Sequence, residues 1–291
     1  MKQIDTLVDD MYKVIEGKGL FSSTIATDMG KRIAQTADER FSHPPQPRSY
    51  LGLSAIGTPC KRKIWYKVNC TEGAEPLMPH TLFKFFYGDM IEELALMIVK
   101  QAGHKVEGEQ TRLDCVGIKG HRDAVIDGMT VDVKSCSPLA FKKFKEGRLR
   151  DDDPFGYISQ LSSYVYAGKN DPLVTEKTKG AFLAIDKVNG HICLDVYDFK
   201  KELKTKKKEI TEIKDMIKGD IPEDKIPPVP QSKTSPNMKL STMCGYCDYK
   251  QKCWPTMRTF LYKTGPVFLT HVEYEPNVPE VKHESAEQKQ G

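Results

Sequence analysis

Two aspartates and a lysine are spaced so that they could share one face of a β-hairpin. Asp127 and Gly128 form the dipeptide best suited to a two-residue turn, and apolar residues alternate on both sides of it. A turn there places Asp123 opposite Asp132, and Lys134 projects from the same face because side chains alternate along a strand. Like charges across a ladder lie only about 5 Å apart and destabilise the sheet. We therefore expect a cation between the two carboxylates.

Two carboxylates and an ammonium on one sheet face are the groups that a hydrolytic metal site needs. Carboxylate oxygens suit hard divalent ions such as Mg²⁺ or Mn²⁺, and a nearby ammonium can orient the attacking water. The other face of the hairpin carries Ala124, Ile126, Val131 and Val133, which predicts that it packs on a core. The alternative interpretation is a surface hairpin whose charges have no chemical role.

A long helix predicted over residues 82–101 offers a third carboxylate. Glu92 shares an apolar stripe with Leu96 and Val99, whereas Glu93 shares a stripe with Asp89 that suits water. A carboxylate among apolar neighbours is costly unless it is paired or bound to metal. Glu92 is therefore the functional candidate, the alternative being a charge at the periphery of the core.

A second predicted helix, after three aspartates and Pro154, places Gln160 and Tyr164 one turn apart. Side chains of these types at that spacing could hold a phosphate or an attacking water. Strands predicted over 181–185 and 192–197, joined across Asn189 and Gly190, would extend the sheet.

The cysteines point to metal ligation. The chain has eight of them, but neither its length nor its polar N-terminus fits a secreted disulfide framework. Cys244, Cys247 and Cys253 give three thiols within ten positions. Such spacing suits tetrahedral thiolate ligation of zinc or of an iron–sulfur cluster, with a fourth cysteine from elsewhere.

Composition limits the class of protein. The 291 residues are 39% hydrophobic and 29% charged, with a net charge of +4. No apolar run approaches the roughly 20 residues that span a membrane, and the N-terminus lacks the apolar core of a signal peptide. We expect a cytoplasmic protein with no membrane partner. Any affinity for nucleic acid must come from local patches.

Two basic segments with aromatic neighbours could contact DNA. Aromatic rings stack on bases and basic side chains hold phosphates, although such clusters can equally be solvated surface. The candidate DNA-binding residues are Arg62, Lys63, Lys142, Lys143 and Lys145.

Domain boundaries follow from composition. Residues 1–50 are predicted to be an N-terminal helical appendage, set off by Pro44, Pro45 and Pro47. Residues 51–275 form the main domain, and residues 276–291, rich in Glu, Lys and Gln, are predicted to be a disordered tail.

Four short motifs in order resemble those of the PD-(D/E)XK nucleases, RecB-like branch. They are Gly88-x-x-x-Glu92, Gly120-His121-Arg122-Asp123, Asp132-Val133-Lys134 and Gln160-x-x-x-Tyr164. Cys60, in Ser54-x5-Cys60-x-Arg62, and the Cys-x2-Cys-x5-Cys group resemble the iron–sulfur variety of that branch, seen in the AddB nuclease domain, and the likeness covers about residues 54–255. It implies a restriction-endonuclease-like α/β (α+β) core, a central mixed sheet flanked by helices, with a Cys-ligated cluster subdomain.

The resemblance implies a role for each matching residue. Asp123 and Asp132 match metal-binding acids, with the Val133 carbonyl as a further ligand and Glu92 as an additional acid. Lys134 matches the lysine that positions the water or stabilises developing charge. Gln160 and Tyr164 match the motif that supports the site and the DNA strand.

For the cysteines, the resemblance implies an iron–sulfur cluster, 4Fe-4S, with zinc as the alternative. Its ligands would be Cys60, Cys244, Cys247 and Cys253. Joining Cys60 to Cys244 closes a long loop, which constrains the unfolded chain strongly, so we expect a structural role. Cys70, Cys115, Cys136 and Cys193 are predicted to be ordinary buried or half-buried thiols.

The function implied is a metal-dependent DNA exonuclease acting at DNA ends in recombination, repair or replication, in a bacterial or phage-infected cytoplasm. The chain has no GxxxxGK[ST] phosphate loop, so a helicase, recombinase or single-strand-binding protein would be a separate partner. The alternatives are a structure-specific endonuclease, a CRISPR-adaptation-type nuclease and a non-catalytic DNA-binding subunit. Two departures from the family are Glu92, where the CRISPR-associated members carry histidine, and Arg122, where a proline is familiar.

Overall fold

The computed structural model describes residues 2–43, 49–70, 74–76 and 78–281. The predicted break at Pro44, Pro45 and Pro47 lies outside them. The helices are η1 (Ile4–Thr6), α1 (Leu7–Ile15), α2 (Ser23–Phe41), η2 (Leu53–Ala55), α3 (Lys61–Asn69), α4 (Pro79–Gln101), α5 (Pro138–Lys145), α6 (Tyr157–Ala167), α7 (Lys200–Met216), α8 (Thr242–Gly245) and α9 (Lys250–Cys253). The strands are β1 (Val106–Glu107), β2 (Thr111–Cys115), β3 (Ile118–Arg122), β4 (Ala124–Ile126), β5 (Met129–Cys136), β6 (Lys179–Asp186), β7 (Ile192–Asp198), β8 (Val229–Pro230), β9 (Met238–Lys239), β10 (Arg258–Tyr262), β11 (Gly265–His271) and β12 (Glu280–Val281).

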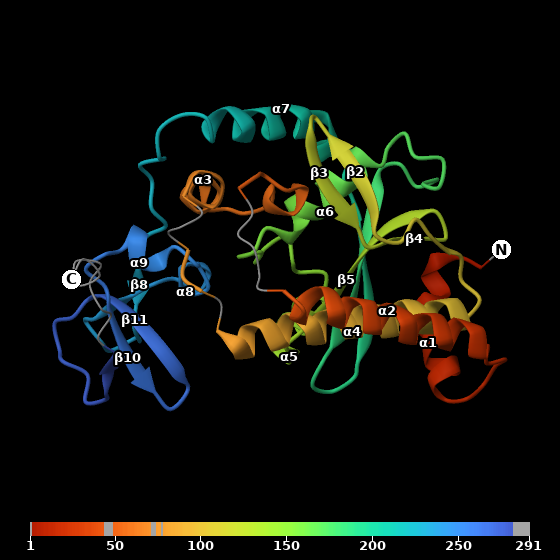
Figure 1. Cartoon of the computed structure of the whole chain (residues 1–291), viewed down its shortest axis with the longest axis horizontal. Coiled ribbons are helices and arrows are strands. Elements are labelled where there is room, and N and C mark those ends of the chain that lie inside the picture. Colours follow the sequence, from red (N-terminus) through yellow and green to blue (C-terminus); the bar gives the residue numbers. More distant parts are fainter. Residues whose placement is uncertain (1, 44–48, 71–73, 77, 282–291) are drawn as a thin grey trace.

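A five-stranded mixed sheet forms the centre of the molecule (Figure 1). Its strand order is β1-β4-β5-β6-β7, and β5 and β6 run parallel while the other neighbours run antiparallel. Helices α1 and α4 pack on one face, and α5 and α6 pack on the other. The fold is therefore an α/β fold with a mixed sheet flanked by helices, as predicted.

The predicted hairpin is formed by β4 and β5. Its register pairs Ile126 with Met129, in agreement with the sequence pattern. Asp127 and Gly128 both have positive φ angles, 47° and 83°, as a type I′ turn requires. The Asp127 carboxylate is held by the buried imidazole of His104, with 2.6 Å between Oδ2 and Nδ1. This contact helps a non-glycine residue to keep the left-handed conformation.

The apolar face of the hairpin packs against α1 and α4. Ala124, Ile126, Val131 and Val133 belong to one buried cluster, as expected from their alternation. The same cluster contains Leu7 and Met11 of α1, both fully buried. Residues predicted to form an N-terminal appendage thus pack directly on the central sheet.

The opposite face of the sheet is covered by α5 and α6. Phe182 of β6 lies fully buried there, in one cluster with Phe144 and Leu161. Gly180 lets α6 approach the sheet, since a Cβ atom at this position would lie 2.8 Å from Cγ2 of Val165. The functional residues on this face are thereby enclosed between the sheet and α6.

The segment from 105 to 113 forms two short strands, β1 and β2, rather than one. Gly108 and Gln110 have positive φ angles, 55° and 49°, so the chain turns between β1 and β2. β2 then pairs with β3 in a separate two-stranded sheet. The second predicted hairpin, β6 with β7, is confirmed.

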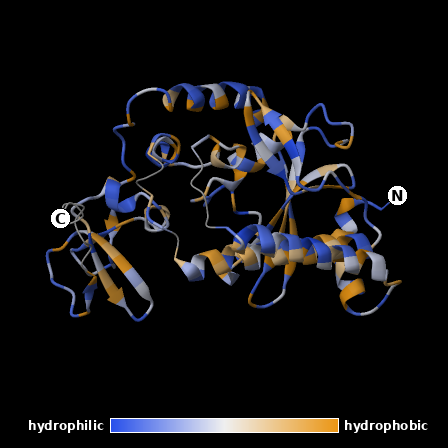
Figure 2. Ribbon diagram, viewed as in Figure 1, coloured by the Kyte–Doolittle hydropathy of each residue, from blue (hydrophilic) through white to orange (hydrophobic). Residues whose placement is uncertain are grey.

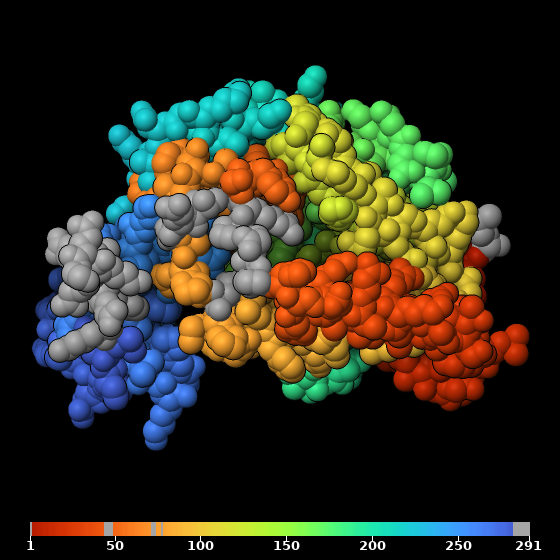
Figure 3. Space-filling view, viewed as in Figure 1, coloured from red at the N-terminus to blue at the C-terminus, as the bar shows by residue number. Residues whose placement is uncertain are grey.

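A second, antiparallel sheet near the C-terminus was not predicted. Its order is β12-β10-β11-β9-β8, and it projects from the end of the molecule opposite α1 (Figure 3). β12 pairs with β10, and Arg258 on β10 holds both Glu275 and Glu280. The structured chain therefore continues beyond Pro276, where a disordered tail was expected. The rest of that tail, 282–291, lies outside the described residues.

Hydropathy follows this architecture (Figure 2). The central strands are largely hydrophobic, whereas α7 is mostly hydrophilic. One lysine of α7 does not face solvent, because Lys206 is buried and pairs with Glu209 at 2.7 Å. Within the described part of the chain, none of the helices combines the length and apolar character needed to cross a lipid bilayer.

Candidate functional site

The carboxylate site, defined here as Glu92, Asp123, Asp132 and Lys134, lies where β5 loses its neighbour β4. The pairing of β4 with β5 ends at Ala124 and Val131, one residue before the predicted opposition of the two aspartates. Asp123 stands between β3 and β4, outside the ladder. Its Oδ2 instead accepts a hydrogen bond from the backbone N–H of Val133, at 2.8 Å. The side chain thus occupies the open edge of the central strand.

Lys134 supplies the cation expected between the acids. Its Nζ lies 2.5 Å from Oδ2 of Asp132, two residues earlier on the same strand face. Burial lowers the pKa of Lys134, but the carboxylates of Asp132 and Asp123 outweigh burial and raise it above its ordinary value. The ammonium therefore stays charged.

Glu92 reaches this edge from α4. Gly88, one turn earlier, lies next to β5, where a Cβ atom would make an ordinary contact of 3.7 Å with Oγ of Ser135. Nε2 of Gln110 donates a hydrogen bond to Oε1 of Glu92 at 2.7 Å. Burial, and then the negative charge of Asp132, raise the pKa of Glu92 to about 7. Glu92 is thus half-buried and close enough to Asp132 for that charge to affect its pKa.

The neighbouring Glu93 was predicted to face water, but in the structure it faces α2 instead. α2 lies along α4, and Nε of Arg32 approaches the Glu93 carboxylate at 3.4 Å. Arg40, further along α2, hydrogen-bonds Asp89 at 2.8 Å. The polar stripe of α4 is consequently covered by a helix that presents arginines to it.

The site carries an excess of negative charge. Burial raises the pKa of Asp123 well above its ordinary value, and the charges of Asp132 and Glu92 raise it further. Three carboxylates are opposed by one lysine, and all three offer hard oxygen donors. This donor set fits a divalent ion such as Mg²⁺ or Mn²⁺.

Gln160 and Tyr164 lie on α6, as predicted, one helical turn apart. Tyr164 is buried, and burial raises the pKa of its hydroxyl, followed by the charges of Asp132 and Asp123. Tyr164 therefore faces the carboxylate site. Gly120 makes room for it, because a Cβ atom there would lie 3.1 Å from Oη of Tyr164.

Two residues of the site were missed by sequence reasoning. Gln110 holds Glu92, and its backbone N–H donates to the carbonyl of Asp123 at 3.1 Å. The second residue is Tyr157, whose ring centroid lies 5.0 Å from Nζ of Lys134. Gln110 sits in a turn with no motif of its own. The aspartates before α6 correctly indicated the start of a helix, because Asp153 accepts hydrogen bonds from the backbone N–H groups of Tyr157 and Ile158. Nothing in the sequence indicated that Tyr157, the first residue of α6, lies beside Lys134.

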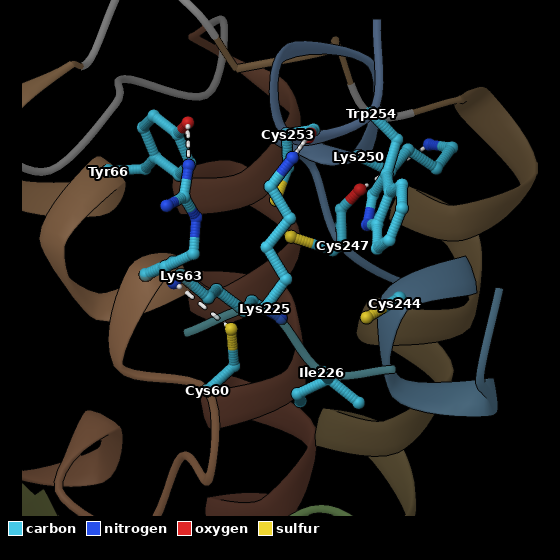
Figure 4. Close-up of a pocket in the computed structure, with 11 residues that line it drawn as sticks. Cys60, Lys63, Tyr66, Lys225, Ile226, Cys244, Cys247, Lys250, Cys253 and Trp254 are labelled. Atoms are coloured by element: carbon cyan, nitrogen blue, oxygen red, sulfur yellow. Dashed lines mark hydrogen bonds between the residues drawn. The ribbon is translucent and has the colours of Figure 1, made fainter. Parts of the chain in front are cut away.

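Four cysteines from separate segments line one pocket of about 320 Å³, the thiol pocket (Figure 4). Cys60 caps α3, while Cys244, Cys247 and Cys253 belong to α8, α9 and the turn between them. In Figure 4, the Lys225 side chain crosses this pocket to the Cys253 carbonyl, 2.8 Å away. The other lining residues are Arg62, Lys63, Tyr66, Ile226, Lys250 and Trp254.

The chemistry of the thiol pocket suits an anionic thiolate centre. Four cationic side chains and no carboxylate line it, and four thiolates around Zn²⁺ or an iron–sulfur cluster leave a net negative charge. Burial raises the pKa of the Cys244 thiol and raises that of Cys247 to about 11. All eight cysteines are free thiols, and among the described residues no three His, Cys, Asp or Glu side chains are positioned to hold a metal ion as they stand. The fit rests on the donor set.

The remaining four cysteines lie outside the thiol pocket. Cys115 and Cys136 are buried, and Cys70 and Cys193 are half-buried. This is the environment predicted for them.

The five predicted DNA-binding residues have different surroundings. Arg62 is engaged within the protein, with Nη1 donating to the Pro222 carbonyl at 2.6 Å. Lys63 lines the thiol pocket, and Lys143 pairs with Asp152 at 2.6 Å. Exposed members of the set are Lys142 and Lys145. Of the five predicted DNA-binding residues, the two that are exposed both lie on α5.

Comparison with known proteins does not supply a family. No family model matches the chain, and no curated protein matches it by sequence. Among solved structures, one of a protein called SSO0001 is similar, at 14% identity, covering 79% of this chain and 96% of that chain with a TM-score of 0.40. A likeness at this level carries no argument about fold or function. The proposals below therefore rest on the residues themselves and on the motifs that they match.

Proposed function

We propose that this chain is a divalent-metal-dependent deoxyribonuclease that hydrolyses phosphodiester bonds at DNA ends. The observation that carries the proposal is the crowding of Glu92, Asp123 and Asp132 beside Lys134 at the open edge of β5. On this reading the mixed sheet is a restriction-endonuclease-like core, and the thiol pocket belongs to a cluster subdomain.

The carboxylates would hold one or two Mg²⁺ or Mn²⁺ ions, with the Val133 carbonyl as a further ligand. Such an ion lowers the pKa of a bound water and polarises a phosphoryl oxygen. The Val133 N–H fixes the Asp123 carboxylate at the strand edge, and Gln110 does the same for Glu92. These contacts pre-orient the acids.

Lys134 and α6 complete the site. The Lys134 ammonium, held at 2.5 Å from Asp132, can stabilise negative charge that develops on the phosphate and can orient the attacking water. Tyr164 is buried near the carboxylates, whose charges contribute to the raised pKa of its hydroxyl, and in this proposal Tyr164 and Gln160 support the strand that carries the scissile bond. Action at ends, rather than within a strand, follows from the motif resemblance.

The thiol pocket would bind a 4Fe-4S cluster through Cys60, Cys244, Cys247 and Cys253, with zinc as the alternative. The pocket joins α3 to the segment between β9 and β10 of the C-terminal sheet, so we assign it a structural role. Motor and loading functions, in this proposal, belong to separate helicase, recombinase or single-strand-binding partners.

The test is cleavage of end-labelled linear DNA, single- and double-stranded, with Mg²⁺ or Mn²⁺. We expect progressive shortening from an end, and a loss on the order of 100-fold or more in Asp132→Ala and in Lys134→Ala. Asp195→Asn is the matched control, because Asp195 is a buried acid two strands from Asp132 on the same sheet face. Full activity in Asp132→Ala would overturn the assignment.

The same assay separates the alternatives. Cleavage of closed circular or branched DNA would indicate a structure-specific endonuclease. Release of defined short fragments rather than progressive shortening would favour an adaptation-type nuclease. Tight DNA binding without cleavage under any metal would indicate a non-catalytic subunit.

A further inference from the structure

Three aromatic rings connect the thiol pocket with the carboxylate site. Tyr246 lies in the turn between Cys244 and Cys247, and its ring centroid is 6.4 Å from that of Phe155, edge to face. Phe155 in turn lies 5.7 Å from Tyr157, over which Lys134 is placed. Phe155, which precedes α6, and Tyr246, which follows α8, are about 90 positions apart along the chain. Together with Tyr157 they form one run of rings that ends at the proposed active site.

Two of these rings are exposed although they touch each other. Tyr246 is 73% exposed and Phe155 is 42% exposed. Neither ring belongs to a buried cluster, so the fold gains little from their size. Exposed ring faces next to a site that acts on nucleic acid are suited to stack on bases, and stacking tolerates any base because every base has a π-face.

Two of the three rings, Phe155 and Tyr157, border a second pocket that opens beside Lys134. About 420 Å³ of empty space is lined there by Lys134, Lys143, Phe144, Phe155 and Tyr157, among others. Its two acids are already engaged, because Asp153 caps α6 and Asp152 pairs with Lys143. The pocket thus offers aromatic walls and a half-buried lysine to an anionic, aromatic ligand.

We infer that Phe155 and Tyr246 form a stacking platform for single-stranded DNA, which guides the strand into the pocket at Lys134. Bases in a duplex are stacked on one another and cannot offer their faces to the rings, so the platform selects a single strand. This inference rests on the proposed function for the identity of the ligand. It adds a substrate preference and two binding residues outside the catalytic machinery.

The experiment is equilibrium binding of a fluorescent oligothymidylate and of a duplex of equal length, measured by anisotropy in EDTA so that cleavage does not occur. Loss of one stacked base weakens affinity by about 5- to 100-fold. We expect Phe155→Ala and Tyr246→Ala to lose affinity in that range for the single strand and to bind the duplex as the wild type does. Tyr246→Phe, which keeps the ring, should bind normally.

A matched control is Tyr274→Ala, which removes a tyrosine that is 70% exposed beyond β11. Absorbance shows whether each variant keeps the thiol centre, and thermal melting shows whether it keeps the fold. If Tyr246→Ala loses either of these, the platform is tested with Phe155→Ala and Tyr246→Phe alone. Wild-type affinity for the single strand in Phe155→Ala, or an equal loss for single strand and duplex, overturns the platform. Because binding is read without metal, this outcome is independent of whether Asp132→Ala abolishes cleavage.

Discussion

At the scale of single residues, the carboxylate site brings together three acids that repel one another and one lysine that attracts them. Asp132 is paired with Lys134, while Glu92 and Asp123 are half-buried near it and have raised pKa values. In the absence of a divalent ion, some of this negative charge is neutralised by protons. Metal and protons should therefore compete for the same oxygens.

The pH dependence of cleavage follows from that competition. With a pKa of about 7, Glu92 is largely protonated below pH 7 and ionised above it. At limiting Mg²⁺ the cleavage rate should rise as pH increases through about 7, and at saturating Mg²⁺ the midpoint should move to lower pH, because the ion displaces the proton. Initial rates across the pH range at both concentrations measure this. A midpoint that does not move with Mg²⁺ would contradict it.

Some residues of the site could be predicted and others could not. Asp132 and Lys134 share a face because strand side chains alternate, which the sequence displays directly. The position of Asp123 depends on where β4 stops, and no local pattern marks the end of a ladder. Gln110 reaches Glu92 only because Gly108 and Gln110 itself adopt left-handed conformations, a tertiary choice that the sequence does not reveal.

At the scale of elements, close approaches at glycine set the position of α6. A Cβ atom on Gly156, just before α6, would lie 1.5 Å from the carbonyl oxygen of Gly57. On β3, a Cβ atom on Gly120 would lie 2.6 Å from Cβ of Leu53 and 3.1 Å from Oη of Tyr164. These contacts fix the tyrosine relative to the carboxylates.

Substituting Gly120 tests this packing. Gly120→Ala should destabilise the protein by about 1–3 kcal/mol, as overpacking does, and should lower the cleavage rate by displacing Tyr164. Gly30→Ala is the control, since Gly30 lies within α2 with open space around it, and alanine there should stabilise by roughly 0.5–1 kcal/mol. Urea unfolding compares the two. Equal stability changes in both variants would refute the account of α6.

The elements differed in how well the sequence predicted them. α4 was evident from its apolar stripe, but the cover over its polar stripe depends on Arg32 and Arg40 of α2, which are distant in sequence. In the C-terminal sheet, β8, β9 and β12 contain two residues each, too few to show alternation. The longer strands β10 and β11 are joined at Lys263 and Thr264, which are not among the dipeptides that mark a tight hairpin turn.

At the scale of the whole molecule, the thiol pocket connects distant parts of the chain. Tyr66 of α3 stacks on Tyr249, with 5.4 Å between ring centroids, and Arg62 holds the segment at Pro222. Cys60 and Cys244 are 184 residues apart, so a metal centre between them would close most of the chain into one loop.

Removing one thiol should therefore weaken the entire fold. We expect Cys60→Ser to lose bound iron or zinc and to lower the melting temperature by roughly 5 °C or more, which corresponds to a few kcal/mol in a protein of this size. Cys193→Ser, a half-buried thiol beside the central sheet, should keep the metal. Metal analysis and calorimetry give both results. Undiminished metal content in Cys60→Ser would exclude that cysteine as a ligand.

The most direct test of the central claim is calorimetric titration of the protein with Mn²⁺, because the claim is that these carboxylates hold a metal ion. The wild type should bind one or two ions, and Asp132→Asn should bind at least about tenfold more weakly. Asp195→Asn should match the wild type, since Asp195 lies roughly 10 Å from Asp132, two strands away. Equal Mn²⁺ affinity in the wild type and Asp132→Asn would contradict the proposed site.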